Sequence, residues 1–389
     1  MTTVGGPSIE RFSLRVEAKE IEDLRWRLTY ARIASTPFAQ GWERGVDDAY
    51  LRELINYWKS GFDWYAQEHA LNDFDHYRAQ VRGLNIHFIW QRGKGLNPKP
   101  LILTHGWPST FYEMHKVIPM LTDPASFGGR PEDSFDVIVP SLPGYGYSDW
   151  PANDQNFSIP AIADLWKDLM VEQLGYDSFF AHGGDIGSGV TSHLALRHPT
   201  HVKAIHITAV RPPYLGEGTE PLDEEELEYQ KLADAWTRDE NGYGHIQGTK
   251  PMTLARGLND SPTGLAAWII EKYRSWSDCD GNVERRFTKD ELLTNITIYW
   301  LTQTIASSFQ PYVLNHRNGR ALRRGDAIIV PTAFARTREP IDRAPLQWAQ
   351  RSYKNITHFH DFESGGHFMA LEEPMLLVRD LQSFFSRYR

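Results

Sequence analysis

Short apolar runs alternate with helical segments over most of the chain after residue 84. Seven runs read as strands, at 84–90, 100–106, 135–141, 178–184, 202–208, 327–333 and 356–362. Several of them are almost continuously apolar, as expected when both faces of a sheet are covered. Strands that alternate with helices predict a mostly parallel sheet with right-handed crossovers. The pattern therefore predicts an α/β core made of residues 84–215 and 325–389.

Residues 1–83 precede this alternation and follow a different pattern. A short strand with alternating Phe12, Leu14 and Val16 comes first, then a helix with one apolar stripe around 21–28, and then a second helix over 51–62. Neither helix can bury its stripe alone. We expect an N-terminal extension that packs against another part of the molecule.

Residues 216–324 interrupt the alternation. They are acidic at first and then helical, with Ser261 as a candidate N-cap before Pro262, and a capping box from Thr288 to Glu291. A helical block of this size inside an α/β domain predicts an inserted cap.

Composition and charge narrow the class of protein. The 389 residues carry a net charge of -9, which argues against nucleic-acid and anionic-membrane binding. Cys279 is the one cysteine and forms no internal disulfide, which is typical of a reducing compartment. The N-terminus lacks the layout of a signal peptide, and no apolar run approaches the roughly 20 residues of a membrane span. A cytoplasmic protein is expected.

The strand at 178–184 leads into a glycine-rich turn and a helix, SFFAHGGDIGSGV. Asp185 stands at the centre of this turn, between Gly183 and Gly187. A strand–turn–helix of this kind is the context of a nucleophile elbow, and a helix N-terminus favours an ionised carboxylate. No G-x-S-x-G occurs in the chain to compete. The alternative interpretation is an aspartate that only caps the helix.

A second motif, HGWP at 105–108, directly follows the strand at 100–106. A turn here would direct the N–H of Trp107 into the site, where the N–H of Ile186 is the usual second donor of an oxyanion hole. An ordinary turn would explain the motif equally well if it stood alone.

A base and its supporting acid are expected near the C-terminus. His367 follows the last strand and a Gly-Gly turn, where a hydrolase places its histidine. A carboxylate must orient that histidine. The loop FARTREPIDRAP, after the strand at 327–333, offers Glu339 and Asp342, and Glu339 is preferred. The alternative is ordinary surface charge.

Together these residues resemble the epoxide hydrolases of the α/β-hydrolase superfamily, in the branch with an N-terminal extension that includes the microsomal enzymes. The resemblance rests on the extension and on the motifs HGWP, PSLPGYGYSDWP, GGDIGS, YWLTQTIASSFQPY and GGHFMALEEP. It implies two cap tyrosines that hold the epoxide oxygen, and Tyr243 and Tyr312 match them by motif. Both could instead simply pack.

One loop departs from the family pattern. Relatives carry the triad acid in a loop of the form FP-x-E, and counting from Val330 places that position on Pro340. Glu339 lies one residue earlier and Asp342 two residues later.

The resemblance implies hydrolysis of an epoxide to a vicinal diol through a covalent ester on Asp185, with no metal or organic cofactor. The expected partner is a small-molecule epoxide, with a homodimer as a further option. Trp107, Trp150 and Trp236 predict a ring-lined pocket for aryl or bulky epoxides, in detoxification or in natural-product (enediyne-type) biosynthesis. A haloalkane or haloacid dehalogenase and a non-catalytic ligand binder are the competing hypotheses.

Overall fold

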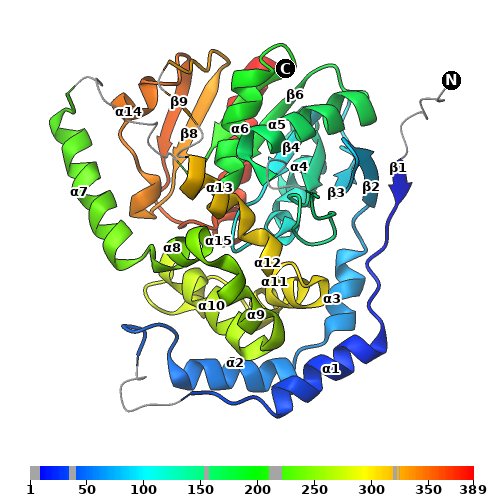
Figure 1. The fold of residues 1–389 in the computed structure, drawn as a ribbon. Coiled ribbons are helices and arrows are strands. Elements are labelled where there is room, and N and C mark those ends of the chain that lie inside the picture. The colour runs from blue at the N-terminus through cyan, green and yellow to red at the C-terminus, as the bar shows by residue number, and fades with distance from the viewer. Residues whose placement is uncertain (1–8, 35–40, 153–156, 210–220, 319–321, 324) are drawn as a thin grey trace.

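A computed structural model describes residues 9–34, 41–152, 157–209, 221–318, 322–323 and 325–389 (Figure 1). Within them the strands form one sheet of nine, in the order β1-β2-β3-β5-β4-β6-β7-β8-β9. The strands are β1 Ile9–Arg11, β2 His76–Val81, β3 Leu84–Gln91, β4 Lys99–Thr104, β5 Phe135–Pro140, β6 Phe179–Gly183, β7 Val202–Ile207, β8 Thr332–Arg336 and β9 Ile356–Asp361.

The sheet is antiparallel at one side and parallel over the rest. Strands β1 to β3 pair antiparallel, and β3 pairs antiparallel with β5. From β5 across to β9 every neighbouring pair is parallel. The predicted mostly parallel sheet is confirmed. The strand expected at 327–333 is displaced, because β8 runs from Thr332 to Arg336 and Ile328 makes only an isolated bridge to Tyr353.

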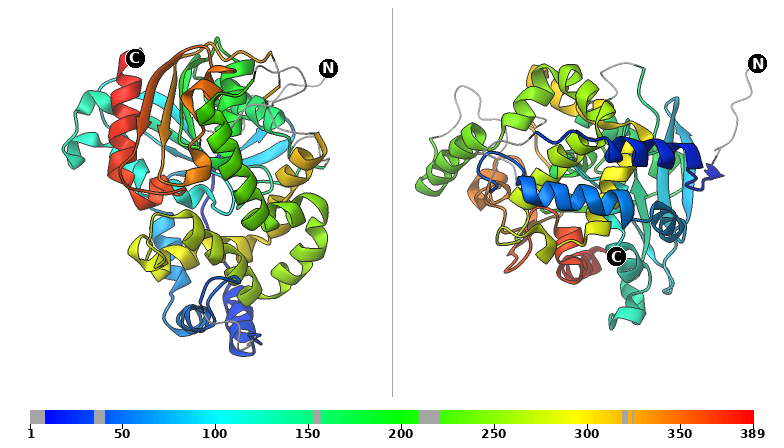
Figure 2. Two further views of the ribbon diagram at one scale, coloured as in Figure 1. Left: turned by 90° about the vertical axis from the view of Figure 1, so that its left-hand side faces the viewer. Right: turned by 90° about the horizontal axis from the view of Figure 1, so that it is seen from below.

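Helices cover both faces of the sheet. Helices α4 (Val117–Thr122) and α16 (Pro374–Phe385) pack together, as do α5 (Ile159–Asp168) and α6 (Asp185–Arg197). Figure 2 shows α16 and α6 on opposite faces of the sheet. Strands β5 and β6 are buried along their whole lengths, which explains why their sequences are mostly apolar, with Asp136 and His182 as the polar exceptions. The short helices α14 (Leu346–Gln350) and α15 (Met369–Glu372) lie near β9 in the sequence.

The inserted block forms a helical cap at one end of the sheet (Figure 1). Its helices are α7 Glu224–Asp239, α8 Gly242–Thr249, α9 Pro251–Asp260, α10 Pro262–Trp276, α11 Lys289–Thr302, α12 Ile305–Ser308 and α13 Gln310–Asn318. Ser261 caps α10 through Gly264, and Thr288 and Glu291 form the expected capping box of α11. The expected cap boundaries at residues 216 and 324 lie outside the described residues.

The N-terminal segment spans the cap and the sheet. Helices α1 (Ala18–Thr29) and α2 (Asp48–Ser60) lie along the cap beside α10 and α11, and α3 (Trp64–Leu71) leads back to the sheet (Figure 2). The Tyr57 hydroxyl donates to Asp290 on α11 at 2.9 Å. The segment also supplies β1 and β2. The short strand predicted around Phe12, Leu14 and Val16 is displaced, because β1 covers Ile9–Arg11, and β2 was not predicted. Among the described residues no helix combines the length and apolar character needed to cross a membrane.

Candidate active site

The turn between β6 and α6 has the form of a nucleophile elbow. Asp185 begins α6 with φ of +46°, a left-handed conformation that non-glycine residues adopt rarely and at a cost. The turn is also crowded, because a Cβ on Gly187 would lie 2.0 Å from the backbone oxygen of Thr104. The glycine lets the helix approach β4 closely. Asp185 thus follows the end of β6 and lines a cavity next to the elbow.

The HGWP turn supplies a hydrogen-bond donor to this carboxylate. The Trp107 N–H donates to Oδ1 of Asp185 at 3.0 Å. One oxygen of the carboxylate is therefore held at a backbone amide, as the predicted oxyanion hole requires of its first donor. Ile186 lines the adjoining cavity, and the use of its N–H as a second donor stays a prediction.

His367 lies between two carboxylates. Its Nε2 is 3.8 Å from Oδ2 of Asp185, and its Nδ1 is 2.6 Å from Oδ2 of Asp342. All three side chains are less than a tenth exposed. A short bond between an imidazole N–H and a buried carboxylate fixes the ring and stabilises its protonated form.

The preference for Glu339 as the partner of the histidine is wrong, because Asp342 makes the contact. Strand β8 extends to Arg336, beyond the predicted end at 333, so the loop starts later than the count from Val330 assumed. A 3₁₀ turn over Pro340–Asp342 then places Asp342 at the histidine. Burial, followed by the charge of Asp342, raises the pKa of Glu339 to about 8. Glu339 is therefore mostly protonated at neutral pH and supplies little counter-charge.

The two cap tyrosines lie together across the cavity from Asp185. Tyr243 on α8 and Tyr312 on α13 have ring centroids 5.8 Å apart, and both line the cavity that Asp185 also lines. Trp107 stacks on Tyr243 at 5.1 Å and meets Tyr312 edge-on at 5.9 Å. The structure thus brings together both tyrosines and the predicted nucleophile, although they are far apart in the sequence.

The cavity has a volume of about 420 Å³ and is lined by both polar and apolar residues. Trp236 lines it, as predicted, while Trp107 is fully buried behind Tyr243. Trp150 is not part of it: that side chain is 52% exposed and lines a separate hollow with Arg27 and Trp300. Its place in the motif PSLPGYGYSDWP gave no information on which way the side chain turns.

Three titratable side chains near the site, those of Glu113, Lys272 and Glu240, were not predicted from the sequence. Burial raises the pKa of Glu113 to about 7, and the charges of His367 and Asp185 also act on that carboxyl. The Lys272 ammonium lies 5.1 Å from the Tyr243 ring centroid, and it binds Glu240 at 2.6 Å. Lys272 could have been found from the sequence, because it is a charged residue within the otherwise apolar stripe of the helix α10.

Comparisons with known proteins agree with this geometry. Residues 9–114 match the family model described as the epoxide hydrolase N terminus, and residues 99–374 match the alpha/beta hydrolase fold. A putative epoxide hydrolase of Stigmatella aurantiaca (strain DW4/3-1) is 39% identical, over 98% of this chain and 86% of its own. Epoxide hydrolase 1 of Sus scrofa is 38% identical, over 97% of this chain and 88% of its own.

Solved structures give the same answer. The juvenile hormone epoxide hydrolase of the silkworm Bombyx mori superposes with a TM-score of 0.87 at 28% identity, over 98% of this chain and 95% of its own. The epoxide hydrolase of Aspergillus niger has a TM-score of 0.84 at 28% identity, over 98% and 97%. The extension, the α/β core and these relatives together show that the chain belongs to the epoxide hydrolase family of the α/β-hydrolase fold and is an epoxide hydrolase.

Proposed function

We propose that the enzyme converts an epoxide to a vicinal diol in two steps, through an ester on Asp185. The observation that carries this proposal is the position of His367 between Asp185 and Asp342, with two phenols across the cavity. His367 is placed to activate the water that would cleave an ester on Asp185. A route through an ester uses all of these groups: the carboxylate as nucleophile, the phenols as acids and the histidine with Asp342 as the base.

In the first step, Oδ2 of Asp185 attacks a ring carbon, and the carbon–oxygen bond of the epoxide breaks. We assign the attack to Oδ2, because Oδ1 accepts from the Trp107 N–H and is thereby already placed as the carbonyl oxygen of the ester. Tyr243 and Tyr312 hydrogen-bond the epoxide oxygen, and one phenol passes it a proton as it leaves. A phenol donates this proton without being charged beforehand.

In the second step, His367 removes a proton from water, and the water attacks the carbonyl carbon of the ester. The negative charge develops on Oδ1 at the N–H groups of Trp107 and Ile186, while Asp342 stabilises the imidazolium. The alkyl oxygen then leaves, taking the proton that the His367 imidazolium holds, and the diol departs. Asp185 is restored with one oxygen from water, and the phenol regains its proton.

A single turnover in ¹⁸O-labelled water, with enzyme in excess over styrene oxide, tests this scheme directly. The ester route transfers an Asp185 oxygen to the diol, so the first diol is unlabelled and the peptide containing Asp185 gains the label. Direct attack of water on the epoxide would label the diol at once and leave the peptide unlabelled. The same assay with a haloalkane checks for halide release, which a dehalogenase would show.

Styrene oxide is a suitable first substrate because the cavity is ring-lined. Tyr229, Trp236 and Tyr353 line its wall beside the two cap tyrosines, and aromatic walls favour flat apolar groups. Aryl or bulky epoxides are therefore proposed as the substrate class. A role in natural-product biosynthesis and a homodimer stay predictions from the sequence.

We expect the two cap tyrosines to share the protonation of the epoxide oxygen. Tyr243→Phe and Tyr312→Phe should each slow ring opening about 10- to 100-fold, and the double variant about 10³-fold or more. Rapid-quench measurement of ester formation reports this step. Tyr57→Phe is the matched control, because its hydroxyl bonds Asp290 at 2.9 Å and the residue does not line the cavity. A double variant that opens the ring at the wild-type rate would exclude the phenols as acids.

We expect Asp342→Asn to slow hydrolysis of the ester about 10³-fold, because the amide cannot stabilise the imidazolium. Glu339→Gln should change that rate less than about threefold, because a glutamine resembles the protonated carboxyl that burial favours there. Single-turnover decay of the ester measures both. An equal loss in the two variants would contradict the assignment of Asp342 as the acid.

A further inference from the structure

The loop that carries His367 is held through its backbone. Four consecutive amides, from Gly365 to Phe368, donate to groups outside the loop. The acceptors are Asp278 Oδ2 at 3.1 Å for Gly365, Glu372 Oε2 at 2.8 Å for Gly366, the Trp276 carbonyl at 2.8 Å for His367, and Glu372 Oε1 at 2.9 Å for Phe368. The base thus sits in a backbone clamp formed by residues 276–278 of the cap and by Glu372.

Glu372 makes most of this clamp. Its two oxygens accept from the amides on both sides of His367, and Oε2 accepts a third hydrogen bond from the Asp278 N–H at 2.8 Å. The residue is 8% exposed. A carboxylate is costly to bury unless its oxygens are satisfied, and three amides satisfy this one. Glu372 therefore joins the loop of the base to the cap.

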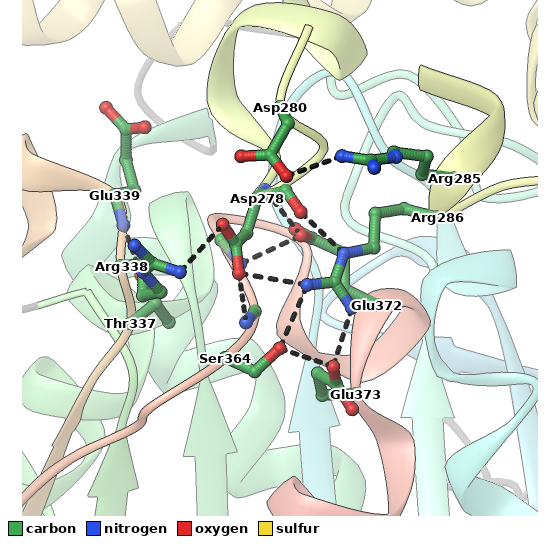
Figure 3. Close-up of polar contacts among 12 residues, drawn as sticks. Asp278, Asp280, Arg285, Arg286, Thr337, Arg338, Glu339, Ser364, Glu372 and Glu373 are labelled. Atoms are coloured by element: carbon green, nitrogen blue, oxygen red, sulfur yellow. Dashed lines mark hydrogen bonds and ion pairs between the residues drawn. The ribbon is translucent and has the colours of Figure 1, made fainter. Parts of the chain in front are cut away.

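Arg286 of the cap forms a second tie to the same loop (Figure 3). Its guanidinium donates to the Asp278 carbonyl and carboxylate at 2.6 and 2.9 Å. It also reaches Glu373 at 2.6 Å and the Ser364 hydroxyl at 2.9 Å. Figure 3 shows these side chains converging from the cap and from the end of the loop, around Asp278.

The fit between loop and cap leaves no room for a side chain at Gly366. A Cβ there would lie 2.6 Å from the Asp278 nitrogen and from the Trp276 carbonyl oxygen. The Trp276 ring also meets the His367 ring edge-on at 5.2 Å. The cap therefore positions His367 in two ways: the Trp276 carbonyl binds its backbone N–H, and the Trp276 ring contacts its imidazole ring.

We propose that Glu372 is a positioning residue for His367, and that it acts by fastening the cap segment 276–278 to the loop of the base. This rests on the proposed function, in which His367 activates the water that cleaves the ester. Glu372 does not touch the substrate. It keeps the imidazole at the distance from Asp185 that the second step requires, whereas the first step needs only Asp185 and the phenols.

Glu372→Gln tests this role, because the amide keeps the size of the side chain but turns one acceptor oxygen into a donor that faces a backbone N–H. We expect hydrolysis of the ester to slow about 10- to 100-fold, as for a small misplacement of a reacting group. Ring opening should change less than about threefold, so the ester accumulates. Glu363→Gln, an exposed glutamate of the same segment, is the matched control and should leave both rates unchanged.

Rapid quench and mass spectrometry of the intact protein measure the two half-reactions with styrene oxide. Equal slowing of both steps in Glu372→Gln, or of neither, would overturn the proposal, because a general structural defect does not select one step. If that variant does not fold, Arg286→Gln should show the same selectivity, and the same outcomes apply to it. Absence of any ester in His367→Gln would instead reject the two-step function itself.

Discussion

We expect Asp185→Ala to lose almost all diol formation while the protein stays folded. The carboxylate supplies the bond to carbon in the proposed first step, and nothing else at the elbow can replace it. We expect turnover of styrene oxide to fall by at least about 10⁴-fold, to the level set by the remaining groups. Chromatography of the diol measures the loss, and thermal unfolding checks that the fold is intact.

The matched control for this variant is Asp177→Ala, which removes an exposed aspartate just before the same strand, β6. It should keep wild-type turnover. Asp185 also holds a left-handed backbone conformation, so Asp185→Gly should be equally inactive and unfold at a higher temperature than Asp185→Ala. Diol formation by Asp185→Ala above about 1% of the wild-type rate would contradict the nucleophile assignment, since covalent catalysis requires that carboxylate.

The site residues that follow strands could be predicted from the sequence. Asp185 and Trp107 come directly after predicted strands, and His367 follows the last predicted strand after the short turn at 363–366. The carboxyl ends of parallel strands meet at one edge of a sheet. Their meeting in space therefore follows from the topology alone. The tyrosines have no such local signal: only the family resemblance indicated Tyr243 and Tyr312, and the packing of α8 on α13 brings them together.

The parts that depend on loop shape were not readable. The choice between Glu339 and Asp342 depends on where β8 ends and on a 3₁₀ turn, and both carboxyls are buried. Element boundaries are the least certain outcome of reading a pattern, and a shift of a few residues changes which side chain faces the histidine. Glu372 is part of the motif GGHFMALEEP, but its role could not be predicted because its partners are backbone amides, which every residue except proline carries.

The N-terminal segment packs on the cap helices, and one of these helices ends at the candidate site. Helices α1 and α2 pack on α10 and α11, and α10 ends at Trp276, which contacts both His367 and Tyr243. Tyr243 and His367, the proposed acid and base, therefore both contact the same indole ring.

His367→Gln is expected to trap the enzyme as its ester. Ring opening uses Asp185 and the phenols, so it continues, but water is no longer deprotonated and hydrolysis slows by at least about 10³-fold. Intact mass spectrometry after mixing with styrene oxide should show a gain equal to the mass of the substrate, located on the peptide that contains Asp185. His360→Gln, an exposed histidine on β9, should show neither effect. A His367 variant that turns over at the wild-type rate would contradict the scheme, because the ester that Asp185 forms would then need no base to cleave it.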